Sequence, residues 1–162
     1  MSNDIHIDDF YKDMARILVL LYGHFPRRIM LYVDDISGPD TPDEFGLHSP
    51  RYEACFQTML WLASTGYLEF NQTVQQDALD QACLTHKAFL LLNSALQDEP
   101  GQDKPGKLDT GDEMLQPADP SNPLIGLESL AINRLKKELN TGTSFSLAKL
   151  MKRLMNDSRR FR

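Results

Sequence analysis

The stretch from residue 49 to residue 70, SPRYEACFQTMLWLASTGYLEF, constrains the fold of this chain more than any other. Ser49 followed by Pro50 marks a helix start, because serine caps a helix N-terminus and proline fits its first turn. Gly66 is suited to the left-handed residue that closes a helix. The aromatic, alternating YLEF that follows is typical of a strand. We therefore predict a helix from residue 50 to about residue 65 that runs directly into a strand.

A wheel drawn at about 100° per residue separates two faces of this helix. The apolar face, expected to be buried, contains Tyr52, Cys55, Phe56, Met59, Leu60, Leu62 and Ala63. The opposite face and its flank contain Arg51, Glu53, Ala54, Gln57, Thr58, Trp61 and Ser64. A tryptophan opposite the core has three interpretations. It packs beneath the C-terminal tail or the N-terminal segment, contacts a protein partner or a second copy of the chain, or stacks on a nucleobase.

Further elements are predicted on both sides of this helix. A helical stripe of apolar residues, from Phe10 to Leu21, indicates a first helix over residues 8–22. Proline in the first turn and a second apolar set indicate another helix over residues 26–36. After the YLEF strand, the polar residues 71–82 would form the tip of a hairpin, with residues 83–84 as the returning strand. Thr85 would then cap a helix over residues 86–96.

The rest of the chain separates into two parts. Residues 97–123 are rich in proline and glycine and almost free of apolar side chains, which predicts a disordered linker. Residues 124–162 contain two helical patterns and form the predicted tail. The second pattern has a stripe at helical spacing, flanked by basic residues: Leu147, Leu150, Met151 and Leu154, with Lys149, Lys152 and Arg153 beside them.

Charge divides the chain at the same place. Residues 1–124 hold eight Lys and Arg against twenty Asp and Glu, whereas residues 125–162 hold nine against three. A basic amphipathic tail of this kind has four possible roles: folding back on the acidic domain, binding a protein partner, contacting DNA, or lying on a membrane. The stripe lacks the aromatic side chains that anchor interfacial helices, so we expect no membrane association.

Two stretches resemble the winged-helix superfamily. TMLWLASTGYLEF is similar to the end of the recognition helix in many bacterial winged helices, and CLTHKAFLLL is similar to the return from the wing into the next helix. Ala88 stands where that second pattern usually has glycine. The resemblance covers residues 8–96 and implies a mainly α fold with a small β-hairpin. We accordingly expect a winged-helix domain over residues 1–96, a linker over 97–123 and a basic tail over 124–162.

The resemblance implies a DNA-binding protein, a transcriptional regulator or a component of a DNA-associated complex. The third helix would lie in the major groove, with Arg51, Gln57 and Thr58 toward the bases. The tail would supply the phosphate contacts through Lys149, Lys152, Arg153, Arg159, Arg160 and Arg162. The charge of the presumed groove helix and hairpin opposes tight DNA binding by this domain alone, because phosphate neutralisation needs cations that these elements lack.

The alternative is a protein-interaction module, either an adaptor subunit or a homodimer. It would bind its partner through Trp61 and the tail stripe of Leu147, Leu150, Met151 and Leu154. The acidic surface favours this alternative, and the resemblance favours DNA.

No motif in the sequence indicates an enzyme or a cofactor. Phosphate-binding glycine loops and nucleophile elbows are missing from the sequence, and its four histidines show no metal-ligand spacing. Cys55 and Cys83 lie within apolar patterns and are expected to be buried free thiols. The chain shows no secretory signal and no spanning segment, so we expect a cytoplasmic protein.

Overall fold

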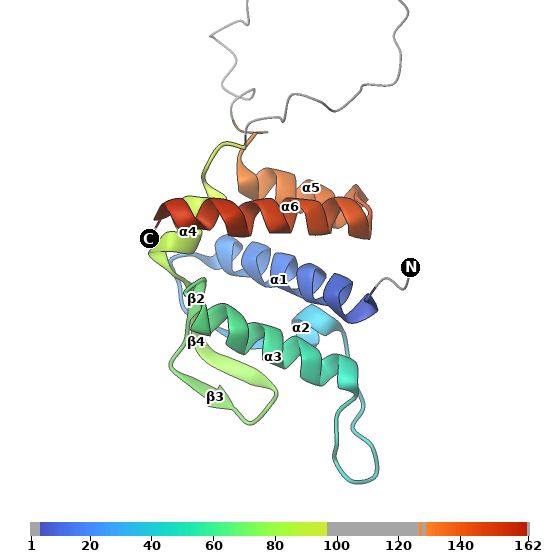
Figure 1. Ribbon diagram of the computed structural model, residues 1–162. Coiled ribbons are helices and arrows are strands. Elements are labelled where there is room, and N and C mark those ends of the chain that lie inside the picture. The colour runs from blue at the N-terminus through green and yellow to red at the C-terminus, as the bar shows by residue number, and fades with distance from the viewer. Residues whose placement is uncertain (1–3, 97–126, 128, 162) are drawn as a thin grey trace, which may run out of the picture.

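The structure, a computed structural model, describes residues 4–96, 127 and 129–161. It is mainly helical with a small antiparallel sheet (Figure 1), as predicted. The predicted linker, residues 97–123, lies outside the described residues. The elements in chain order are α1 (Ile5–His24), β1 (Ile29–Tyr32), α2 (Asp34–Ser37), α3 (Pro50–Ser64), β2 (Leu68–Glu69), β3 (Gln72–Val74), β4 (Ala78–Leu84), α4 (His86–Leu92), α5 (Ala131–Thr141), α6 (Ser144–Asp157) and the 3-10 turn η1 (Ser158–Phe161).

Both ends of α3 form as its sequence predicts. The Ser49 hydroxyl accepts a hydrogen bond from the Tyr52 amide at 3.3 Å, which satisfies one of the free donors at the helix start. At the other end Gly66 adopts a left-handed conformation with φ of 82°. β2 starts two residues later, so the helix leads directly into the sheet.

β4 is the central strand of the sheet. It pairs with β1 along one edge and with β2 and β3 along the other, all antiparallel. The hairpin expected behind α3 is therefore present. Its returning strand begins at Ala78 instead of residue 83, because the polar stretch between β3 and residue 83 also pairs.

The prediction of a helix over residues 26–36 is wrong. Residues 29–32 form strand β1, and only Asp34–Ser37 is helical. Met30 and Tyr32 face solvent while Leu31 is fully buried, which is the period-two pattern of a half-buried strand. Pairing with β4, from 46 to 53 residues further along, satisfies the β1 backbone and decides between the two patterns.

The C-terminal helices belong to the same core as the rest of the chain. α5 and α6 pack on α1, and α1 lies between them and α3 (Figure 1). Their return is fixed where the chain leaves α4, because Leu96 N donates to Ser129 O and Ala131 N donates to Ser94 O, both at 2.9 Å. The predicted tethered tail is thus a packed part of the fold, and of its proposed roles folding back on the domain is the one observed.

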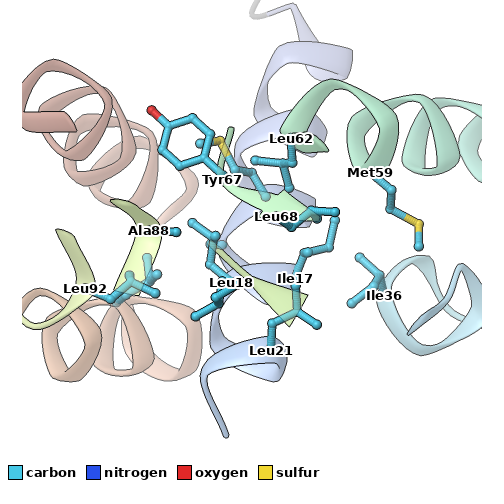
Figure 2. Close-up of a cluster of buried hydrophobic side chains, with 14 of the residues drawn as sticks. Ile17, Leu18, Leu21, Ile36, Met59, Leu62, Tyr67, Leu68, Ala88 and Leu92 are labelled. Carbon is cyan, nitrogen blue, oxygen red and sulfur yellow. The ribbon is translucent and has the colours of Figure 1, made fainter. Parts of the chain in front are cut away.

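One hydrophobic core joins these layers. Figure 2 shows side chains of α1, α2, α3, β2 and α4 meeting around the buried face of α1. Ile17 and Leu18 stand at its centre, with Leu62 of α3 and Leu68 of β2 against them (Figure 2). Since α1 is covered on opposite sides, it is the element on which the others assemble.

Candidate functional site

An open groove of about 610 Å³ lies between the first turns of α1 and the outward face of α3. Its apolar walls are formed by Ile7 and Phe10 on α1 and by Ala54, Leu60 and Trp61 on α3. The strong caps of α3 hold the second wall in place, and packing on α5 and α6 holds the first. The groove is thus a hollow in the surface with mainly apolar walls.

Asp13, one of the residues that line the groove, belongs to a bidentate ion pair. Arg51 Nη1 and Nη2 of α3 donate to the two carboxylate oxygens of Asp13 of α1, at 2.6 and 2.5 Å. Asp13 is only 1% exposed, and the Arg51 side chain is 33% exposed. Asp9 lies one turn earlier, with its Oδ2 atom 3.6 Å from Arg51 Nε. These contacts join α1 to α3 and commit the guanidinium to an internal partner.

The ion pair changes the protonation behaviour of its neighbourhood. Hydrogen bonds to Asp13 raise the pKa of the Arg51 guanidinium above its ordinary value, against the opposing effect of burial. Cys55 lies beside the pair, and burial together with the Asp13 charge raises the pKa of its thiol to about 12. Cys55 and Cys83 are both buried free thiols, as predicted.

Trp61 belongs to an aromatic cluster at the edge of the groove. Its ring meets Phe10 edge-on at 5.1 Å and lies nearly parallel to Tyr67 at 6.3 Å between centroids. Trp61 remains 38% exposed, so one part of the ring packs on α1 while another part faces the groove. Of the three interpretations of Trp61, packing against the N-terminal helix is therefore observed, and the exposed part remains available to a partner.

Two of the three α3 residues predicted to contact DNA, Thr58 and Arg51, are engaged by partners within the protein. Thr58 is 4% exposed, and its hydroxyl donates to Ala54 O at 2.9 Å, because the helix turns this flank inward. Arg51 is held by Asp13. Gln57 alone is fully on the outward face, where it lines the groove with Trp61. The structure thus does not bring these three side chains to one exposed surface.

The tail residues predicted to bind a partner are largely buried. Leu147, Met151 and Leu154 pack into the core, and Leu150 is partly buried against it. Their physical role is to cover α1. Among the predicted tail contacts to DNA, Lys149, Lys152, Arg159 and Arg160 are exposed and Arg153 is partly buried, while Arg162 lies outside the described residues. The Lys152 ammonium stands 5.7 Å from the centre of the Tyr11 ring.

A second polar cluster lies at the start of α3, away from the groove lining. His48 places Nδ1 3.0 Å from Asp40 Oδ2 and Nε2 3.1 Å from Asp77 Oδ1, and its ring stacks on Tyr52 at 4.0 Å. Hydrogen bonds from Ser49, with His48 nearby, lower the pKa of Asp40 below its ordinary value. Burial and the Asp77 carboxylate raise the pKa of the Tyr52 hydroxyl. The cluster ties the loop of residues 38–49 to the turn of the hairpin.

The carboxylates on the α1 side of the groove were not predicted as part of a site. Asp9 and Asp13 are four residues apart on the same helical face as Phe10, inside an otherwise apolar stripe. A carboxylate at such a position indicates a buried partner, so the sequence did contain a signal for the ion pair. The sequence did not indicate which residue the partner is, because Arg51 is 38 residues away from Asp13 in the chain. The same holds for His48 and Asp77, whose proximity depends on the hairpin.

The chain matches no protein-family model, no curated protein and no solved structure. No helix among the described residues is both long and apolar enough to cross a membrane. Within residues 4–96, 127 and 129–161, no three His, Cys, Asp or Glu side chains are arranged to hold a metal ion.

Proposed function

We propose that this protein is a non-enzymatic protein-interaction module with a winged-helix-like fold, and that the groove between α1 and α3 binds a segment of a partner protein. The observation that carries the proposal is the groove itself, whose lining among the described residues includes Trp61 and Phe10 and no Lys or Arg. Partly exposed tryptophan beside apolar walls is characteristic of anchor points at protein interfaces.

The charge of α3 supports a protein partner over DNA. Arg51 is its only cation, and both of its terminal nitrogens are engaged by Asp13. The outward face that remains presents Glu53, Gln57 and Trp61. Non-specific affinity for DNA comes mainly from cations that neutralise phosphates, and this face offers none.

The position of α6 also bears on the choice. α6 packs on the side of α1 opposite to α3 (Figure 1), and the ammonium of its exposed Lys152 lies over the Tyr11 ring of α1. DNA binding that combines Gln57 of α3 with the cations of α6 would therefore have to reach across α1, which lies between these two helices.

The order of elements supports the winged-helix part of the proposal. A helix, a strand, a short helix and a capped third helix are followed directly by an antiparallel hairpin whose central strand also pairs with the first strand. In the superfamily that the sequence resembles, the third helix presents its outward face to a ligand. Here that face forms one wall of the groove.

Site-specific photo-cross-linking tests the proposal. A photoreactive residue at Gln57, inside the groove, is expected to form a discrete protein adduct in the native host, and one at Gln72, exposed in β3, is not. Trp61→Ala should remove the Gln57 adduct because it removes the anchor, while the circular dichroism spectrum remains that of a folded protein.

The same experiment distinguishes protein binding from DNA binding. If Gln57 gave no protein adduct, the interaction proposal would be wrong. If it cross-linked nucleic acid instead, and the full-length protein shifted a duplex in a gel at about 50 mM salt, DNA binding would replace it. The salt dependence of that shift would then identify the contribution of the exposed cations of α6.

A further inference from the structure

We infer that the partner segment is an amphipathic helix with Lys or Arg beside its apolar stripe. This inference rests on the proposed function and adds the chemical class of the partner. Two properties of the groove support this inference. Its walls offer no strand edge with which the backbone of a peptide could pair, and its charge is negative.

The walls of the groove favour a helix over an extended peptide. Both are α-helices, α1 and α3, whose backbone groups along the groove are bonded within each helix. An extended segment gains affinity by pairing its backbone with an open strand edge, and these walls offer no such edge. A helix satisfies its own backbone and needs only an apolar surface for its stripe, which Ile7, Phe10 and Trp61 provide.

The charges around the groove favour a basic helix. Asp9 and Asp13 line the groove, and the one guanidinium beside them, that of Arg51, offsets only one of their two negative charges. Glu53 is exposed on α3 one turn before Gln57. Residues 4–96 together hold thirteen Asp and Glu against six Lys and Arg, so the longer-range field has the same sign.

Trp61 is the single tryptophan of the chain and reports directly on the groove. The probes are two designed helical peptides without tryptophan, each with leucines at i, i+3, i+4 and i+7. One carries lysines beside the stripe and the other carries glutamates. Titrated into the full-length protein at about 50 mM salt, the lysine peptide should shift Trp61 emission and bind at least about tenfold tighter than the glutamate peptide, with the difference shrinking as salt screens the charges.

A matched pair of variants separates the groove from the overall charge. Asp9→Asn should weaken the lysine peptide about two- to fivefold, as expected for a partly exposed charge pair. Asp80→Asn in β4 removes the same charge outside the groove and should change affinity less. Equal effects of the two variants would mean general electrostatic adhesion and would overturn the inference.

The remaining outcomes distinguish this inference from the proposed function. A glutamate peptide that binds as tightly as the lysine peptide would overturn the basic character and leave the groove as an apolar docking site. If neither peptide moved Trp61 emission, the inference of a helical partner would fail, while the Gln57 cross-link would still decide whether a protein binds there.

Discussion

At the scale of single residues, the Asp13–Arg51 ion pair joins α1 to α3. It places a carboxylate that is 1% exposed against a guanidinium that is partly open to solvent. Such a pair contributes little to the free energy of unfolding compared with an apolar pair of the same volume. Removing one partner is nevertheless costly, because the other is left as a buried charge without compensation. The residue predicted to read DNA is therefore required to neutralise a buried charge.

Arg51→Met should lower the free energy of unfolding by about 3 kcal/mol, the lower end for a broken buried pair because Arg51 is one third exposed. The reason is that Asp13 is left charged in the core. Urea denaturation at pH 7 measures the change. In the double variant Asp13→Leu with Arg51→Met, most of the lost stability should return, and a double variant no more stable than the single one would contradict this explanation.

At the scale of elements, the loop of residues 38–49 is held by polar contacts more than by apolar ones. Asp40 accepts from the Ser49 amide at 3.1 Å and faces His48 at 3.0 Å, and Asp43 Oδ1 accepts from the amides of Phe45 and Leu47. The loop thereby fixes Ser49, the residue that caps α3, so the protonation state of Asp40 affects the start of that helix.

This element should respond to acid through Asp40. Its pKa in the folded protein is below the ordinary value of 3.8, so Asp40 stabilises the fold above about pH 3.8 and this contribution is lost as the pH falls toward the folded pKa. Between about pH 5 and about pH 3, an interval that spans the ordinary pKa of Asp, Asp40→Asn should therefore lose less free energy of unfolding than the parent protein does. Urea unfolding at the two pH values measures the slopes, and identical slopes would exclude Asp40 as a contributor.

At the scale of the whole molecule, the C-terminal helices complete the core. Ile132, Leu135, Leu147, Met151 and Leu154 are buried against residues that would otherwise face water. Burying each such side chain contributes about 1.5–3 kcal/mol. Their sum is comparable with the whole stability of a typical domain, about 5–15 kcal/mol.

A chain ending at residue 96 should therefore lose cooperative unfolding and bind a hydrophobic dye, because the side of α1 that α5 and α6 cover would be exposed. Thermal unfolding followed by circular dichroism, with dye fluorescence on the same sample, measures both. Full-length protein with Lys137→Gln, an exposed change on α5, is the control and should melt as the parent does. A sharp transition in the truncated chain near the parent midpoint would show that the acidic domain folds alone.

Local sequence patterns were sufficient wherever the signal was local. The Ser49 cap, Gly66 and Thr85 each depend on neighbours within a few residues, and all three form as predicted. The groove was predictable only in part. Trp61 and Gln57 were placed on the outward face of α3 from the helical period alone, whereas on the opposite wall only Phe10 was singled out, as part of the apolar stripe of the first helix.

The sequence by itself determined the helix and strand periods of most elements, the burial of the two thiols and the outward position of Trp61, because side-chain spacing and capping act over one or two turns. Only the tertiary structure decided that residues 29–32 are a strand, that Arg51 neutralises Asp13 and that α6 covers α1. Each of these depends on a contact between segments at least 38 residues apart. Such contacts are selected by the burial of the whole core, and no window of sequence contains both partners.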